Sequence, residues 1–146
     1  MTRTDDALVS TFGRLLEAAH GLEQRLGRSL EARHDLPLTW FEVLLRLSRS
    51  PRGELTMTEL ARQIALTSGG VTRLVDRIAA AGYVERRPCQ EDRRVQYAAI
   101  TQAGRAALAP ALTGHATDLR SVFEGFTAAE LTALDGALDR LRPHAG

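Results

Sequence analysis

The chain has 146 residues, of which 44% are hydrophobic and 25% are charged, and these values are typical of one globular domain. It contains no run near the ~18 consecutive apolar residues of a membrane-spanning helix and no cationic segment leading into an apolar one at its N-terminus, so we expect a cytoplasmic protein without a membrane partner. Its single cysteine, Cys89, excludes an intramolecular disulfide and a cysteine-based zinc site.

The net charge of +1 is unevenly distributed along the chain. All 19 basic residues are arginine, whose planar guanidinium suits bidentate contacts with phosphate. Residues 62–105 hold eight arginines and four acidic residues, whereas the rest of the chain holds eleven arginines and fourteen acidic residues. A basic middle between acidic flanks indicates contact with nucleic acid through one region, although such a run is also typical of a solvated surface.

The N-terminal half of the chain is predicted to be helical. Apolar residues at three- and four-residue steps predict one long amphipathic helix over residues 6–33. Three Thr-x-x-Glu capping boxes, at Thr39, Thr56 and Thr127, predict the starts of a second helix, of a short third helix ending near Ile64, and of the last helix. The apolar residues of the long helix are Leu8, Phe12, Leu15, Leu16, Ala19, Leu22, Leu26 and Leu30.

A fourth helix is expected to begin with Thr67 as its N-cap and to stop near Gly82. Only residues 65–66 separate it from the third helix, and two short helices joined by so tight a turn form a helix-turn-helix. After Gly82 the pattern changes, and residues 83–87 and 95–100 predict two strands of a hairpin. A hairpin in this position is the wing of a winged helix-turn-helix.

The C-terminal part predicts a fifth helix over residues 101–123, bent near Pro110 and Gly114, followed by the last helix. The apolar stripes at the two ends of the chain lie outside the winged unit, and packing against a second copy would bury them, which predicts a homodimer. The predicted fold class is therefore mainly α with a small β-hairpin wing. The stripe of the last helix consists of Leu131, Leu134, Leu138 and Leu141.

Two stretches resemble the MarR family of bacterial transcriptional regulators. The segment EDRRVQYAAIT at 91–101 is similar to the family's wing signature, and MTELARQIALTSGGVTRLVDRIAAAGYVERR at 57–87 is similar to its DNA-binding helices and first wing strand. The resemblance implies a transcriptional regulator, commonly a repressor, that binds a pseudo-palindromic operator on double-stranded DNA as a homodimer. It also implies release by a small-molecule effector, often an aromatic acid.

The resemblance covers nearly the whole chain, so we expect a single MarR-type domain over residues 1–146. The winged helix-turn-helix lobe is expected at 38–101, with dimerisation helices at 6–33 and 102–142. Because no Ser-His-Asp order, phosphate loop or metal quartet is present, we expect no enzyme activity, no cofactor and no metal. A protein-interaction module without DNA binding is the alternative, and the arginine-rich wing argues against it.

Candidate DNA contacts begin in the first turn of the fourth helix. Beyond the expected cap at Thr67, the backbone N–H groups of Ser68, Gly69 and Gly70 suit a phosphate. One turn later, Thr72 and Arg73 can reach base edges, and arginine to guanine is the commonest specific contact. The alternative is that the glycines only ease a tight turn between helices. These candidates are Thr67, Ser68, Gly69, Gly70, Thr72 and Arg73.

The wing supplies a second group of candidates, Arg86, Arg87, Arg93 and Arg94. They surround the expected wing tip, where contact with phosphate or the minor groove is natural, and their alternative role is a solvated hairpin. The resemblance implies that Asp92 shapes the wing by pairing with an arginine, for which Arg94 is the candidate. Arg77 could reach a phosphate or form a surface ion pair with the adjacent Asp76.

Weaker candidates concern regulation. Phe12, His20, Trp40 and Arg46 are candidates for an effector pocket, with core packing and ordinary helix-face positions as the alternatives. Cys89 lies among the arginines of the wing, so a redox-responsive or a constitutive regulator is an alternative to one released by a ligand, although an incidental position is favoured. Two Glu-x-x-His pairs on the first helix are fourteen residues apart, about 21 Å, and cannot share a metal.

Overall fold

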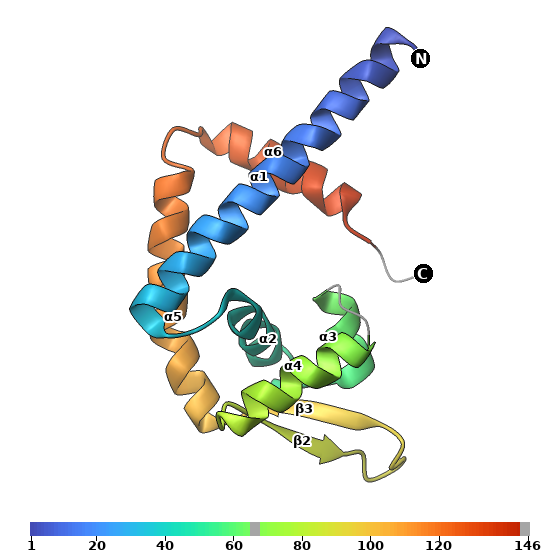
Figure 1. The fold of residues 1–146 in the computed structure, drawn as a ribbon, viewed down its shortest axis with the longest axis vertical. Helices are drawn as coiled ribbons and strands as arrows, with labels where there is room; N and C mark the ends of the chain where they lie inside the picture. Colours follow the sequence, from blue (N-terminus) through green and yellow to red (C-terminus); the bar gives the residue numbers. More distant parts are fainter. Residues whose placement is uncertain (65–67, 144–146) are drawn as a thin grey trace. The chain divides into compact units, whose positions relative to one another are not determined.

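The computed structural model describes residues 1–64 and 68–143, and the described residues form helices with one small antiparallel sheet (Figure 1). This confirms the predicted fold class. The chain divides into two compact units, residues 1–115 and 116–146. The boundary falls inside a helix that continues from one unit into the other. None of the described helices is long and apolar enough to cross a membrane.

The first helix, α1 (Arg3–His34), begins earlier than the apolar periodicity indicated. Thr2 caps it: its hydroxyl accepts a hydrogen bond from the Asp5 amide at 3.1 Å, and the Asp5 carboxylate accepts one from the Thr2 amide at 2.8 Å. Because this first turn is polar, the apolar pattern could not reveal it. Only the C-terminal part of α1 contributes buried side chains, Leu26 and Leu30, and its first half extends away from the core (Figure 1).

The capping box predicted at Thr39 is wrong. Helix α2 (Leu38–Ser48) begins one residue earlier, with Pro37 at the N-cap and no side-chain cap. The ring of Pro37 holds its φ at −59°, and its carbonyl accepts the first helical hydrogen bond, from the Phe41 amide at 2.9 Å. Thr39 therefore lies within the first turn, where its hydroxyl is not at the capping position.

The wing belongs to an antiparallel sheet of three strands with the order β1-β3-β2. The hairpin of β2 and β3 was predicted, with Val84 opposite Ile100 and Pro88 opposite Gln96. The sequence did not predict β1, which pairs Leu55 with Ala98, because a strand of three residues has no visible alternation. The strands are β1 (Glu54–Thr56), which follows the short helix η1 (Pro51–Gly53), β2 (Val84–Pro88) and β3 (Gln96–Ile100).

The two helices of the helix-turn-helix are α3 (Met57–Gln63) and α4 (Ser68–Ala80). The capping box predicted for α3 is confirmed, since the Thr56 hydroxyl and the Glu59 carboxylate each accept a hydrogen bond from the other's amide at 3.1 Å. Both hydrogen bonds join residues three positions apart, so the capping box can be recognised from the sequence alone.

The end of α4 is fixed by Gly82, as predicted. Gly82 has a φ of +87°, a conformation that side-chain-bearing residues rarely adopt. Its amide donates to the Ala79 carbonyl at 2.9 Å, and the Tyr83 amide donates to the Ile78 carbonyl at 3.3 Å. This pair of bonds closes the helix with a left-handed glycine and turns the chain directly into β2.

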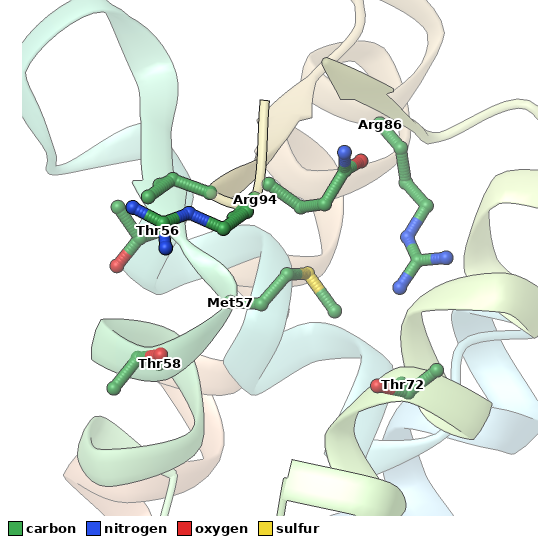
Figure 2. Close-up of a pocket in the computed structure, with 8 residues that line it drawn as sticks. Thr56, Met57, Thr58, Thr72, Arg86 and Arg94 are labelled. Carbon is green, nitrogen blue, oxygen red and sulfur yellow. The ribbon is translucent and has the colours of Figure 1, made fainter. Parts of the chain in front are cut away.

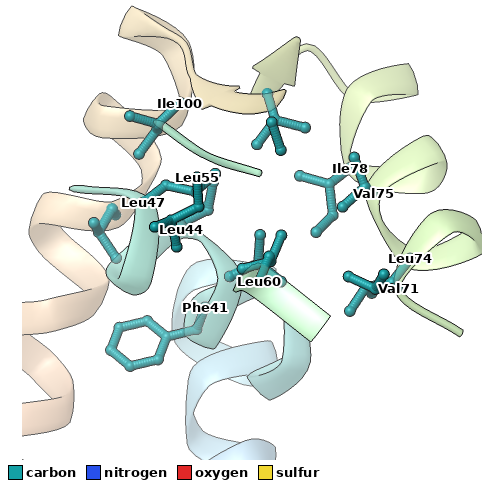
Figure 3. Close-up of a cluster of buried hydrophobic side chains, with 14 of the residues drawn as sticks. Phe41, Leu44, Leu47, Leu55, Leu60, Val71, Leu74, Val75, Ile78 and Ile100 are labelled. Carbon is teal, nitrogen blue, oxygen red and sulfur yellow. The ribbon is translucent and has the colours of Figure 1, made fainter. Parts of the chain in front are cut away.

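One apolar core supports both the helix-turn-helix and the sheet (Figure 3). Side chains from α2, α3, α4, β1 and β3 meet in it, so the short elements share their buried surface. The most buried of those labelled are Phe41, Leu44, Leu47, Leu60, Val71, Val75 and Ile78, each no more than 2% exposed. The orientation of α4 relative to the wing is therefore set by close packing.

Helix α5 (Gln102–Val122) is capped by Thr101, whose hydroxyl accepts from the Gly104 amide at 3.0 Å. The chain stays helical through Pro110. Gly114, which the sequence indicated as part of a bend, has a packing role: a Cβ there would lie 2.7 Å from Nε2 of His34. The absence of a side chain at Gly114 leaves room for the His34 imidazole at the end of α1.

The second unit contains the end of α5 and the helix α6 (Ala128–Leu141). The capping box predicted at Thr127 is confirmed: its amide donates to the Glu130 carboxylate at 2.9 Å, and its hydroxyl accepts from the Glu130 amide at 3.1 Å. Before the helix, the rings of Phe123 and Phe126 pack edge to face, with centroids 5.4 Å apart. Helix α6 itself has no buried residue.

The close packing at Gly104 predicts a large effect of a single methyl group. A Cβ at Gly104 would lie 2.2 Å from the Tyr83 carbonyl oxygen, and this backbone atom cannot rotate away. We expect Gly104→Ala to lower the free energy of unfolding by about 1–3 kcal/mol, measured by urea denaturation. The control is Gly21→Ala in α1, where a Cβ meets nothing within 4 Å and stability should rise by about 0.5–1 kcal/mol. Equal stabilities of the two variants would contradict this packing.

Candidate nucleic-acid interface

Helix α4 buries one side and exposes another that carries charge. Its inward residues are those of the core, whereas Arg73, Asp76 and Arg77 are exposed and Thr72 is half-buried. Residues four apart lie above one another on a helix, so Arg73 and Arg77 form one strip, and Thr72 and Asp76 form the strip beside it. Two arginines on an exposed strip are what an interface with DNA phosphates and base edges requires.

The first turn of α4 places a guanidinium close to the glycines. The predicted cap, Thr67, lies outside the described residues, and the helix begins at Ser68. Gly69 is exposed, and a Cβ built on it would lie 3.6 Å from Nη1 of Arg73. Arg73 therefore lies back toward the N-terminus of α4, where the helix dipole already favours an anion. Gly70, in the same turn, is half-buried.

A hollow of about 400 Å³ lies between α4, the start of α3 and the wing. Figure 2 shows Thr72 of α4, Thr58 and Met57 of α3, and Arg86 and Arg94 of the wing around it. The structure thus brings Thr72, Arg86 and Arg94 together, although they are distant in sequence. Sequence reasoning missed Thr58 and Met57. The capping box that starts α3 was the available signal, because it puts both in the first turn of that helix.

The predicted pair of Asp92 and Arg94 is present. Arg94 Nε lies 3.1 Å from Asp92 Oδ1 and Nη2 lies 3.3 Å from Oδ2, and the Arg94 amide donates to Oδ1 at 3.1 Å. These hydrogen bonds, from the Arg94 side chain first and its backbone second, hold the pKa of Asp92 below its ordinary value. The Arg94 side chain is still 91% exposed, so its positive charge faces solvent.

Asp76 does not pair with its neighbour Arg77, as one alternative had it. It pairs with Arg86 of β2, with Arg86 Nη1 3.2 Å from Asp76 Oδ1. The reason is geometric, since adjacent residues on a helix point about 100° apart and do not face each other. Among the described residues, no ion-pair partner is found for Arg77, which stays exposed on the strip of Arg73.

The four wing arginines do not form one group. Neighbouring residues of a strand point to opposite faces, so Arg87 faces away from the hollow that Arg86 lines. Arg87 pairs with Glu85 and, at 3.6 Å, with Glu54 of β1. Arg93 is exposed, and the described part of the chain offers it no ion-pair partner. The positive charge beside α4 therefore comes from Arg86 and Arg94, and Arg87 belongs to the other face of the wing.

Cys89 lies on this other face. Its thiol is free and half-buried, and it lines a separate hollow of about 390 Å³ together with Arg87 and Tyr97. Among the described residues, no three histidine, cysteine or carboxylate side chains gather as metal ligands.

The four effector candidates do not meet in the structure. Phe12 is 60% exposed on the first half of α1, and His20 is exposed on the same helix. Trp40 packs edge to face against Tyr83, with ring centroids 6.4 Å apart. Arg46 lines a groove of about 560 Å³ between α1 and α2.

This groove has an apolar lining with charged groups among it. Its charged residues are Glu23 of α1 with Glu42 and Arg46 of α2, and His115 of α5 also lines it. Burial raises the pKa of Glu42, the negative charge of Glu23 raises it further, and Arg46 lowers it. The apolar lining consists of Ala19, Leu22, Leu26, Leu38, Phe41, Leu45 and Ile64. The residues from α1 and from α2 follow three- and four-residue steps that are visible in the sequence, but the pairing of the two helices is not.

The fold matches solved structures of one family. Sco3205 from Streptomyces coelicolor, a MarR family transcriptional regulator solved in complex with DNA, is 30% identical, has a TM-score of 0.86, and is matched over 97% of this chain and 88% of its own. The chain belongs to the MarR family. A family model described as MarR family matches residues 34–95, which include α2, α3, α4 and most of the wing. Members of the family are transcriptional regulators, and this chain is one of them.

Other family members agree with this assignment. A mutant MarR from E. coli, solved in complex with operator DNA, is 26% identical with a TM-score of 0.79, over 92% of this chain and 96% of that one. MarR of Salmonella typhimurium is 27% identical over 90% of this chain and 91% of its own length. The transcriptional repressor YetL of Bacillus subtilis is 33% identical over 87 residues, which are 52% of its length, so the match covers about half of that regulator.

The hydrogen bonds of Asp92 predict its titration. A carboxyl with a lowered pKa stabilises the folded wing above its ordinary pKa of 3.8, and this stability is lost as the pH falls through the lower, folded value. A carbon NMR titration should therefore find Asp92 titrating below 3.8, and Arg94→Ala should move it back toward that value. Glu130, whose own pKa is lowered by its hydrogen bonds with Thr127, is the control, since it should titrate alike in both proteins. An unchanged Asp92 in the variant would contradict the pairing.

Proposed function

We propose that this regulator is a sequence-specific repressor that binds a pseudo-palindromic operator as a homodimer. The observation that carries the proposal is the shared position of Thr72, Arg86 and Arg94 around the hollow between α4 and the wing, next to the exposed strip of Arg73 and Arg77. Sco3205 and the E. coli MarR mutant, which share this fold, have been solved bound to DNA. YetL, which shares part of the sequence, is a repressor.

Helix α4 is the element that enters the major groove in this proposal. Its first turn, Ser68 to Gly70, brings backbone amides and little side-chain bulk to a phosphate. Arg73 then reads a base edge, and Thr72 contacts a base or a phosphate beside it. Arg77 reaches a phosphate one turn further on. Residues 38–101 form the DNA-binding lobe that holds these groups together.

The wing contacts the flanking DNA with Arg93 and Arg94. Both side chains are exposed. Asp92 restricts the conformation of the Arg94 side chain, and Arg93 adds a second positive charge beside it. Arg86 approaches DNA from the side of α4. Arg87 faces the other side of the wing and is tied to two carboxylates, so we assign it to the shape of the wing in place of the direct contact expected from sequence.

The homodimer is supported by apolar side chains that the single chain leaves exposed. On α1, Leu8, Val9 and Phe12 are 60–63% exposed, and on α6, Leu138 and Leu141 are 41% and 69% exposed. Such stripes are unfavourable in water and are covered when two copies associate. The dimerisation segments are 6–33 and 102–142. Sedimentation equilibrium should give a dimer, and a wild-type monomer that binds the operator would contradict the proposal.

Two-fold symmetry then fixes the form of the operator. Two α4 helices entering successive major grooves read half-sites about 34–36 Å apart. We expect Arg73→Ala to weaken operator binding by about 1–3 kcal/mol and to relax selection at one base pair in each half-site, whereas Arg94→Ala weakens binding to all duplexes and lowers the salt slope by about one per protomer.

Selection of bound sequences from random duplexes, followed by gel shifts at several salt concentrations, measures both effects. Arg3→Ala, at an exposed position of α1 outside the DNA-binding lobe and the dimerisation segments, is the matched control and should leave both quantities unchanged. The proposal fails if the wild-type protein selects no sequence, or if the Arg73 and Arg94 variants bind as the wild type does.

Release by a small effector is the second part of the proposal. It rests on the family resemblance and on the groove between α1 and α2, where Arg46 can receive the carboxylate of an aromatic acid above an apolar lining. An effector acts only if it binds one arrangement of the dimer more tightly than the other. A constitutive regulator, or one that responds to oxidation at Cys89, is the alternative.

Two probes with the same ring and opposite charge test the groove. We expect calorimetry to detect binding of benzoate, because its carboxylate pairs with the guanidinium, and no binding of benzylamine. Arg46→Gln should weaken benzoate binding about tenfold or more, while Arg49→Gln, at the exposed end of α2, is the control. Binding of benzylamine alone would show that Glu23 and Glu42 select the ligand instead, and binding of neither would favour the constitutive regulator.

A further inference from the structure

An acidic residue stands on the side of α4 that faces the wing. Asp76 is exposed, one helical turn beyond Thr72 and next to Arg77, and its side chain contributes nothing to the apolar core. A carboxylate in this position repels DNA phosphates. It therefore needs a physical reason, and its only ion pair within the described chain is with Arg86.

The Asp76–Arg86 pair joins two elements that the chain places apart. Asp76 belongs to α4 and Arg86 to β2. The ion pair therefore joins the helix to the wing, at the edge of the hollow that Arg86 and Thr72 line. In Figure 2 the Arg86 side chain extends from the strand toward α4, above Thr72. The pair of Asp92 and Arg94, in contrast, lies within one loop.

Arg86 Nη1 lies 3.2 Å from Asp76 Oδ1, and the Arg94 guanidinium donates to Asp92 through both Nε and Nη2. A guanidinium has five N–H donors, so Arg86 keeps donors for a second acceptor while Asp76 holds it. Its side chain is 35% exposed, partly shielded from water but accessible to a phosphate.

We propose that Asp76 is a positioning residue for DNA recognition: it fixes the Arg86 guanidinium between α4 and the wing, aimed at a phosphate of the operator. This inference rests on the proposed function. A cation already held in place loses less side-chain freedom when it binds, but it contacts the phosphate well only where α4 is seated in its major groove. On other duplexes the charge of Asp76 offsets that of Arg86, which weakens binding there.

Asp76 therefore contributes to selectivity more than to affinity. Removing its charge releases Arg86, which then reaches phosphates of any sequence, and removes one repulsive charge from the interface. Binding to random DNA becomes tighter, while the operator loses the contribution of a fixed contact. If Asp76 had a purely structural role, its substitution would not change the ratio of the operator and random-duplex affinities. The presence or absence of Arg86 would make no difference to that result.

The test compares Asp76→Asn, Arg86→Ala and the double variant in the full-length protein. Dissociation constants are measured for the selected operator and for a random duplex of equal length, at several salt concentrations. Asp76→Asn should tighten random-duplex binding a few-fold and lower the operator preference about tenfold. Arg86→Ala should lower the preference by a similar factor, and the double variant should lower it no further, because one interaction is lost in each case.

Two controls separate positioning from charge alone. Glu91→Gln removes an exposed wing carboxylate that has no ion pair among the described residues, so it should tighten binding to both duplexes equally and leave the preference unchanged. Asp76→Glu keeps the charge and should restore most of the preference. Thermal melting of each variant shows whether it is folded, and a variant that melts as the wild type does is compared directly.

Three results would overturn the inference: an unchanged preference in Asp76→Asn, effects of the two single variants that multiply in the double variant, or the same loss of preference in Glu91→Gln. Each of these leaves the proposed function intact, because the wild-type protein still selects an operator. If the wild-type protein has no preference for any duplex, the proposed function fails and the role of Asp76 fails with it.

Discussion

Leu60, Ile78 and Ile100 lie in one apolar core, and the surface that we propose to face DNA depends on this shared packing. Helix α3 has seven residues, and the strands have three to five, lengths that are not stable alone in water. Each element stays folded because its apolar side is covered by the others. The charged groups of α4 and the wing consequently have fixed relative positions before any DNA binds, which is what recognition by direct contact requires.

Local signals in the sequence predicted local structure well. Thr56 and Thr127 start helices as expected, because a capping box is complete within four residues, and Gly82 ends α4 because its left-handed φ is a property of that residue alone. The capping box predicted at Thr39 is absent because Pro37, two residues earlier, is already the N-cap of the helix. The strand at Leu55 was not predicted, because its pairing with β3 is long-range and no pattern within three residues can show it.

The candidate site was predicted in part for the same reason. The Asp92–Arg94 pair lies within one loop, and the resemblance of the wing segment to the MarR family indicated it. The Asp76–Arg86 pair joins a helix to a strand, so the sequence could not show it. The opposite faces of Arg86 and Arg87 were predictable from the two-residue period of a strand. Effector candidates such as Phe12 were less certain, because periodicity along α1 does not reveal which turns of that helix meet α2.

The hydroxyl of Thr101 helps to join two helices. It donates to the Gly82 carbonyl at 2.6 Å and accepts from the Gly104 amide at 3.0 Å, while its own amide donates to the Tyr83 carbonyl at 3.0 Å. One residue thus joins the end of α4 to the start of α5, and the two segments are closely packed at Gly104. We therefore expect a rotation of α5 at this end to displace the end of α4 as well, so that a ligand bound against α5 could alter the position of α4.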